Sequence, residues 1–190
     1  MKAGAGIKSR RLVIRHWRDE DRAFFHRINS DPEVMAFFPV RRSRAEADRF
    51  FEMLAKSLEE TGMGWAAVTL RSSGEQIGFA GLAKVRFEAA FTPAVEIGWR
   101  LVPEAWGRGY ATEAAEALLE HGFSELGLNE IVSFAVWNNA RSKAVMRRIG
   151  MAADPALDFD HPGVPDTHPQ LKRHVFHRIT RTLWAERPSR

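Results

Sequence analysis

The stretch VEIGWRLVPEAWGRGYATEAA, residues 95–115, decides the fold. Apolar residues alternate through its first third, which is typical of a strand, and its last third has the alanine-rich composition of a helix. Between them lies a short loop with two glycines, Gly107 and Gly109. A loop that leads from a strand into a helix directs several backbone N–H groups to the positive end of the helix dipole. Because glycine has no side chain to shield the backbone, this loop is suited to binding a diphosphate through main-chain amides.

The rest of the chain predicts a mixed sheet. A hairpin turn at residues 72–75 makes the strands beside it antiparallel, and a long helical crossover makes the strands that flank it parallel. We therefore expect an α+β fold in which a mostly antiparallel central sheet has helices on both faces. The expected elements are strand 11–17, helix 19–29, a turn and short helical piece over 31–39, helix 43–60, strands 65–70, 76–87 and 94–102, helix 110–126, strand 130–137, helix 139–149, an irregular segment 154–169 and a closing strand 172–184.

Length and composition indicate one domain. With 190 residues, we expect a flexible N-terminal segment at 1–10, a single domain at 11–185 and a tail at 186–190. The chain has no cysteine, which excludes disulfides, a thiol nucleophile and a zinc–thiolate site. No apolar run at the N-terminus resembles a signal peptide, and no segment has the length of a membrane span. We therefore expect a cytoplasmic protein with no membrane partner.

The charge pattern favours an anionic ligand over a nucleic-acid partner. The formal net charge is +4, but the arginines are dispersed along the chain and not clustered. We expect no nucleic-acid partner, and a basic nucleic-acid-binding module remains the weaker alternative. Four histidines, at positions 161, 168, 174 and 177, match no known zinc spacing, so no metal is expected.

Three segments, in order, carry a resemblance to a known family. They are RLVIRHW at 11–17 with the DED and DPEVM that follow, EIGWRLVPEAWGRGYATEA at 96–114 and NNARSKAVMRRIGM at 138–151. Together they resemble the GCN5-related N-acetyltransferases (GNAT), in particular the RimJ/RimL-like branch, over residues 11–151. The resemblance implies an α/β/α fold in which splayed parallel strands form a cleft for acetyl-CoA, the acetyl donor. It also implies a primary amine as the acceptor, either a protein N-terminus or a small molecule, and a monomer or homodimer.

The resemblance also implies the residues that bind acetyl-CoA. The family's loop often begins with glutamine or arginine, whereas Trp106 holds that position here, so the pyrophosphate contacts should come mainly from the backbone. Pantetheine is expected to lie along residues 99–102 as an added strand, with an N–H near Trp99 polarising the acetyl carbonyl. The implied set is Trp99, Leu101, Val102, Trp106, Gly107, Arg108, Gly109, Tyr110, Ala111, Thr112, Asn139 and Ser142.

Two residues are candidates for proton transfer, each with a structural alternative. Glu96 can act as a general base through water, or it can be a structural carboxylate paired with an arginine. Ser142 matches a serine proposed to protonate the departing thiolate, or it can be an ordinary helix serine. The family's frequent tyrosine acid is absent, since Met146 and Arg147 occupy its neighbourhood.

The acceptor is left open by the sequence. Phe37, Phe38, Trp65 and the segment 154–169 are candidates to line its pocket. The expected mechanism is direct attack of the amine on the thioester, without a covalent intermediate. A non-catalytic acyl-CoA sensor on the same fold remains an alternative to an enzyme.

Overall fold

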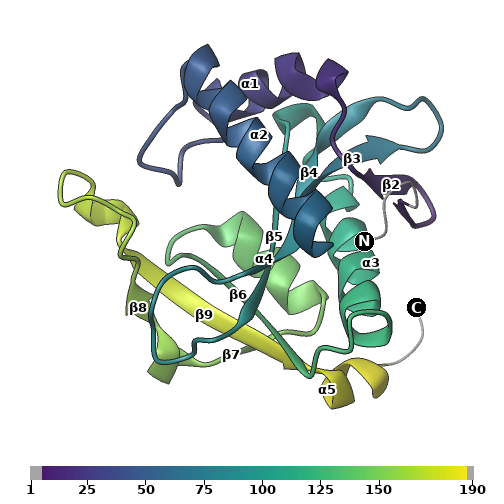
Figure 1. Ribbon diagram of the computed structural model, residues 1–190. Helices are drawn as coiled ribbons and strands as arrows, with labels where there is room; N and C mark the ends of the chain where they lie inside the picture. The colour runs from purple at the N-terminus through teal and green to yellow at the C-terminus, as the bar shows by residue number, and fades with distance from the viewer. Residues whose placement is uncertain (1–5, 188–190) are drawn as a thin grey trace.

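The computed structural model describes residues 6–187 and contains one sheet of nine strands (Figure 1). The strand order is β1-β2-β3-β4-β5-β6-β9-β7, and β8 pairs with β9 at the side. The strands are β1 (Ile7–Lys8), β2 (Leu12–Arg15), β3 (Gly64–Leu70), β4 (Gln76–Lys84), β5 (Val95–Leu101), β6 (Glu130–Val136), β7 (Ala152–Ala153), β8 (Phe159–Asp160) and β9 (Arg173–Thr180). The helices are α1 (Arg22–Ser30), α2 (Arg44–Thr61), α3 (Tyr110–Ser124), α4 (Ala140–Arg148) and α5 (Arg181–Ala185).

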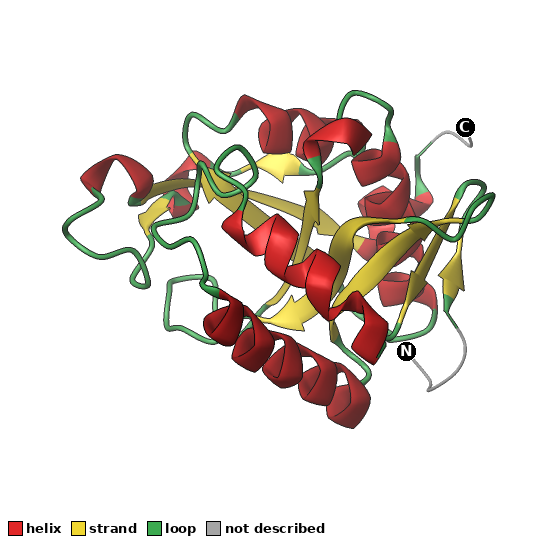
Figure 2. Ribbon diagram, turned by 90° about the horizontal axis from the view of Figure 1, so that it is seen from above, coloured by secondary structure: helices red, strands yellow, loops and turns green. Residues whose placement is uncertain are grey.

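Helices cover both faces of the sheet, as expected. On β4 the Phe79 ring packs against Phe25 of α1, whereas the Leu82 side chain reaches Gly122 of α3. Residues an odd number of positions apart on a strand point to opposite faces. The α1–α2 layer and α3 are therefore on opposite sides of the sheet, and Figure 2 shows these helices flanking the strands.

The sheet is antiparallel except at its centre. Strands β2 to β5 pair antiparallel in chain order, and β6 pairs antiparallel with β9. The parallel contact between β5 and β6 is reduced to one pair, Glu96 with Val132. Beyond this pair the two strands part, and this opening holds the candidate site.

Three expected elements differ from the structure. The closing strand ends at Thr180, because its side chain accepts the Leu183 N–H and begins helix α5. The segment 31–39 forms successive turns and no helix, since the Asp31 carboxylate accepts the N–H groups of Glu33 and Val34. Strand β1 pairs with β2, so the sheet begins before residue 11. Residues 1–5 and 188–190, parts of the expected flexible ends, lie outside the described residues.

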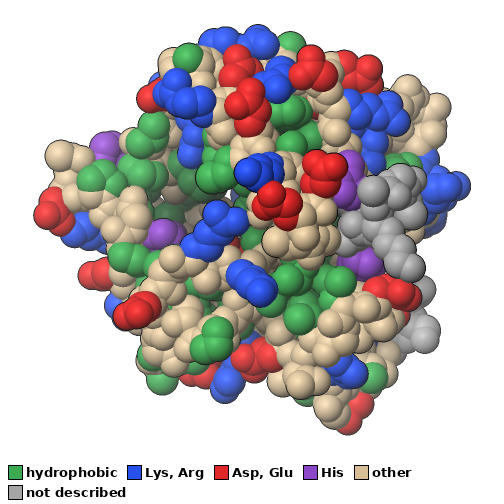
Figure 3. All heavy atoms as spheres, viewed as in Figure 1, with side chains coloured by type: hydrophobic (Ala, Val, Ile, Leu, Met, Phe, Trp, Pro, Cys, Tyr) green, Lys and Arg blue, Asp and Glu red, His purple; other side chains and the backbone are tan. Residues whose placement is uncertain are grey.

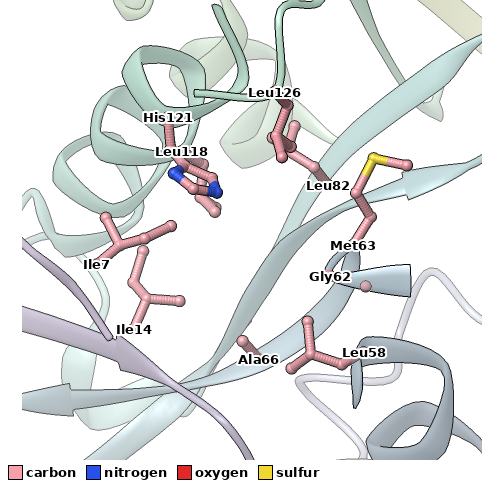
Figure 4. A pocket seen from close by; sticks show the side chains of 11 residues that line it. Ile7, Ile14, Leu58, Gly62, Met63, Ala66, Leu82, Leu118, His121 and Leu126 are labelled. Atoms are coloured by element: carbon pink, nitrogen blue, oxygen red, sulfur yellow. The ribbon is translucent and has the colours of Figure 1, made fainter. Parts of the chain in front are cut away.

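A small cavity beneath α3 has no room for a ligand. It has a volume of about 20 Å³ and is lined by apolar side chains around His121, such as Ile14 and Leu118 (Figure 4). That volume suffices for about one water molecule. The cavity is therefore a packing feature of the core. Among the described residues, no helix is both long and apolar enough to span a bilayer.

The close approach of β3 and β4 generates a stability prediction. A Cβ added to Gly81 would lie 1.9 Å from the carbonyl oxygen of Gly64, so the backbone would have to move. We expect Gly81→Ala to lower the free energy of unfolding by about 1–3 kcal/mol and Tm by roughly 2–12 °C, measured by thermal denaturation. The control is Gly163→Ala, whose added methyl would meet only the His161 ring. Equal Tm values for Gly81→Ala and the wild type would contradict the strand packing.

Candidate functional site

The edge of β5 that faces β6 is open beyond Glu96. The Ile97 carbonyl accepts a hydrogen bond from Ser133 Oγ on β6 (2.9 Å), and the Leu101 carbonyl accepts one from the Trp106 indole N–H (2.8 Å). Backbone groups on a strand alternate sides, so Trp99, which lies between these two residues, directs its N–H and C=O to the same edge. The structure thereby leaves the Trp99 main chain available to an added strand, as the sequence predicts.

The loop after β5 leads directly into α3. Gly107 and Gly109 have φ values of 73° and 78°, a left-handed conformation that favours glycine. The helix hydrogen bonds begin with the Glu113 N–H, which donates to the Gly109 carbonyl. The first-turn N–H groups of Tyr110, Ala111 and Thr112 have no partner within the helix. These amides, with the helix dipole behind them, form the expected place for an anion.

Arg11 of the N-terminal region fixes the outer side of this loop. Its Nη1 donates to the Arg108 carbonyl (3.1 Å), and its Nε forms an ion pair with Glu113 (2.6 Å). Its guanidinium lies 4.6 Å from the centroid of the Tyr110 ring. Arg11 thus holds the Arg108 carbonyl on the outer side of the loop.

Two of the predicted cofactor residues have no free amide. The Trp106 N–H donates to the Pro103 carbonyl, and the Val102 N–H donates to Ile77 on β4. Proline at position 103 begins a short 3₁₀ turn, which uses the Trp106 amide internally. The Trp106 ring is fixed through its indole N–H, and Arg141 stacks on it at 4.0 Å. The N–H groups of Trp106 and Val102 are therefore used within the protein, and the assignment of these two residues to the cofactor site stays a prediction for their other atoms.

Helix α4 brings two further predicted residues to the opening. Asn139 caps the helix, and its Oδ1 accepts the Ser142 N–H (3.1 Å). This arrangement confirms Asn139 as the helix cap. The Nδ2 group of Asn139 makes no hydrogen bond to another described residue and can donate to a ligand. The Ser142 hydroxyl makes no hydrogen bond to any other residue in the described range. Met146, which with Arg147 occupies the neighbourhood of the family's frequent tyrosine, is buried.

A cleft of about 470 Å³ lies between β5 and β6, a volume within the usual range of small-molecule sites. It is hollowed between the α1–α2 layer and the half of the sheet that carries β9 (Figure 3). Of the predicted site residues, the cleft brings together Glu96, Trp99, Asn139 and Ser142. The loop at 106–112 does not line it and begins beyond the end of β5.

Glu96 lies in the wall of this cleft without a charged partner. No ion pair or hydrogen bond joins its carboxylate to another described residue, so no arginine there pairs with it as the structural alternative requires. Burial raises the pKa of Glu96 to about 7. A carboxylate with a pKa close to the working pH is suited to general base catalysis.

The other walls of the cleft include residues that the sequence predicted and residues that it did not. Phe37, Phe38 and Trp65 line the cleft as expected, and the segment 154–169 contributes His161 and its neighbours. The cleft wall also includes Arg42 and Arg100, which were not predicted from the sequence. For Arg100 a signal was present, because it lies four positions after Glu96 and therefore on the same face of β5.

Two histidines at the cleft belong to an aromatic cluster. The rings of His161 and His174 are 5.0 Å apart. Burial, with the neighbouring His174, lowers the pKa of His161 to about 4. Within residues 6–187, no group of three or more His, Asp or Glu side chains is placed to hold a metal ion. His161 is therefore neutral at physiological pH.

The comparisons with known proteins agree with this architecture. Residues 11–152 match the family described as the acetyltransferase (GNAT) domain. The uncharacterized N-acetyltransferase YnaD of Bacillus subtilis is 34% identical over 149 residues, which cover 76% of this chain and 81% of YnaD. The FsC-acetyl coenzyme A-N(2)-transacetylase of Aspergillus fumigatus is 29% identical, over 100% of this chain and 83% of its own.

A solved structure shows the same fold. The crystal structure of a GNAT-family acetyltransferase from Bacillus anthracis superposes with a TM-score of 0.77 and 26% identity, over 94% of this chain and 99% of that one. The shared fold includes the mixed open sheet and its covering helices. The chain therefore belongs to the GNAT acetyltransferase family.

Proposed function

We propose that the protein transfers an acetyl group from acetyl-CoA to a primary amine. The observation that supports this most directly is the open edge of β5, where the Trp99 main chain faces the cleft beside Glu96 and Ser142. A pantetheine arm is an amide chain, and it can pair with such an edge as a strand would. The Trp99 N–H would then polarise the acetyl carbonyl.

The loop and helix α3 would bind the diphosphate of the donor. The N–H groups from Gly107 to Thr112 supply donors, and the helix dipole contributes about 0.3–1 kcal/mol per charge. Asn139, whose Oδ1 is already engaged in its cap, would donate from Nδ2 to a pantetheine amide. In this arrangement most contacts to the diphosphate come from backbone N–H groups. This agrees with the sequence, because Trp106 holds the loop position where the family often has glutamine or arginine.

The chemistry would be a direct transfer. The amine nitrogen attacks the thioester carbon, a C–N bond forms, and the C–S bond breaks as the tetrahedral intermediate collapses. Glu96 would take a proton from the amine through water, and Ser142 would give one to the departing thiolate. The absence of cysteine from the chain agrees with a path that has no acyl-thiol intermediate on the protein.

The acetyltransferase relatives support an amine as the acceptor, and they do not distinguish one class of amine from another. The RimJ/RimL-like branch and a cytoplasmic location remain predictions. A protein that binds CoA but releases no thiol with any amine would be an acyl-CoA sensor. A nucleic-acid function is not supported, because basic and acidic side chains are interspersed over the face shown in Figure 3.

The anion site at the loop generates the first test. Saturation with CoA at about 100 times Kd should stabilise the protein by roughly 2.7 kcal/mol and raise Tm by about 5–11 °C. Gly109→Trp should remove this shift, because the new side chain would cover the loop amides. Gly127→Trp is the matched control, since Gly127 has a similar φ of 67° just after the other end of α3. A full CoA shift in Gly109→Trp would place the anion site elsewhere.

The Glu96 carboxylate generates a second test with two readouts. If it is the base, kcat/KM should rise with pH through about 7, and Glu96→Gln should lower the rate by about 10²–10⁴-fold and remove this rise. The control is Glu88→Gln on the exposed loop after β4. An unchanged pH profile in Glu96→Gln would exclude Glu96 as the base.

The second readout of Glu96→Gln is stability. The folded-state pKa lies above the ordinary value of 4.5, so ionisation of Glu96 destabilises the fold increasingly above pH 4.5 and fully above pH 7. Glu96→Gln should therefore raise Tm relative to the wild type at pH 8 and leave it unchanged at pH 4. The same Tm difference at both pH values would contradict the burial of the carboxyl group.

The third test concerns Ser142. Ser142→Ala keeps the backbone N–H that donates to Asn139, so the helix cap should persist. We expect kcat to fall by about 10–100-fold, with the Kd for CoA unchanged. An unchanged kcat, measured by release of free thiol, would leave Ser142 as an ordinary helix residue.

A further inference from the structure

Two arginines line the acceptor side of the cleft without a carboxylate partner. They are Arg42, in the turn before α2, and Arg100 on β5. In the part of the chain that the structure describes, neither guanidinium has an ion-pair partner. The Nε of Arg100 is shielded from solvent and has no hydrogen-bond partner.

Asn29 holds both arginines in place. Its Oδ1 accepts a hydrogen bond from Arg100 Nη1 (2.6 Å), and its backbone carbonyl accepts the Arg42 N–H (3.0 Å). Asn29 is itself fully buried, and its Nδ2 donates to the Phe25 carbonyl (2.7 Å). This network orders the two residues before any ligand binds.

Aromatic rings support the guanidinium groups. Arg100 lies 3.9 Å from the centroid of the Phe38 ring, and Arg42 lies 4.0 Å from that of Phe50. Stacking on a ring leaves the edge of a guanidinium, where its N–H donors lie, free for a planar oxyanion. The cleft therefore presents two oriented groups that match a carboxylate.

The fold compensates only in part for the cost of these charges. Burial, with the charge of nearby Arg42, lowers the pKa of Arg100 to about 9, and burial lowers the pKa of Arg42 more than the charge of Glu46 raises it. Both remain cationic at neutral pH, and like charges held close together repel. A bound anion would satisfy both groups and the unpartnered Nε.

The arginines occupy one end of the cleft and Glu96 the other. Glu96 and Arg100 lie on the same face of β5, four residues and thus roughly 13 Å of strand apart. Glu96 is the acidic residue of the cleft wall. An acceptor can therefore present its amine toward Glu96 and an anionic group toward the arginines.

We propose that the acceptor is an amine that also carries a carboxylate, and that Arg42 and Arg100 bind this carboxylate. This inference rests on the proposed acetyl transfer and adds the substrate class. The body of the acceptor would be apolar, because the Trp65 ring lines the cleft beside Gly98, midway between Glu96 and Arg100 on β5. Polycationic amines are disfavoured, since they would meet two positive charges that have no ion-pair partner among the described residues.

The test compares phenylalanine with phenylalaninamide, which lacks the carboxylate, and adds phosphoethanolamine as a phosphate-bearing amine and spermidine as a polycationic one. Each is offered with acetyl-CoA, and release of free thiol is measured. We expect kcat/KM for phenylalanine to exceed that for its amide by about 10-fold or more, because a hydrogen bond to a charged group contributes about 1.5–3 kcal/mol. A preference for the phosphate compound over phenylalanine would overturn the carboxylate assignment, and a preference for spermidine or the amide would overturn the anionic class.

Variants connect the preference to the two arginines. Arg42→Gln and Arg100→Gln should each raise KM for phenylalanine by about 10-fold or more and leave both KM for phenylalaninamide and the Kd for CoA unchanged. Arg41→Gln, at an exposed neighbouring arginine, should behave as the wild type. An equal rise in KM for the acid and the amide would show that the arginines are merely structural.

A binding readout keeps the proposal testable when turnover is absent. Hydrocinnamate and its amide are titrated into the protein–CoA complex, and Tm is recorded. The acid should raise Tm in the wild type and not in Arg42→Gln, whereas equal shifts for acid and amide would overturn the proposal. Loss of the CoA shift itself, or no thiol release with any amine, would count against the proposed function and not against the anion site.

Discussion

The separation of β5 from β6 after the single pair of Glu96 and Val132 is the constraint on which the site depends. If the two strands stayed in register, their backbone N–H and C=O groups would bond to each other and leave no room for a ligand. Here the Ser133 hydroxyl donates to the Ile97 carbonyl in place of a backbone N–H of β6, and the backbone pairing between the two strands ends there. The edge beyond it is held open by protein contacts on both sides, since β4 pairs with β5 and β9 pairs with β6 along their lengths.

Main-chain and side-chain groups have different functions in this arrangement. The backbone at Trp99 and the loop from Gly107 to Thr112 present N–H donors that any sequence with the right glycines could supply. The side chains on the opposite face of β5, Glu96 and Arg100, carry the charges that would distinguish one acceptor from another. Strand alternation thus places main-chain groups at the edge of β5 and the charged side chains of Glu96 and Arg100 on one of its faces, within a strand of seven residues.

Much of the fold could be predicted because its signals are local. The capping box of Ser43 and Glu46 and the left-handed Gly62 mark the ends of α2 as expected, and the glycine loop marks the start of α3. Competition between local side-chain hydrogen bonds and the sheet was not predicted. At Thr180, for example, the side chain caps helix α5, and β9 ends there. Motif residues such as Asn139 were expected at the site, and they line the cleft. Residues that depend on tertiary pairing were not expected, as for Arg42, whose N–H donates to the Asn29 carbonyl on α1.

The central claim is that the open edge of β5 and the loop before α3 together bind the acetyl donor. A crystal structure of the protein with CoA tests it most directly. The account predicts pantetheine paired with the Trp99 main chain and the diphosphate bound by N–H groups between Gly107 and Thr112. Coenzyme bound elsewhere, with the loop amides directed into the protein interior, would contradict it.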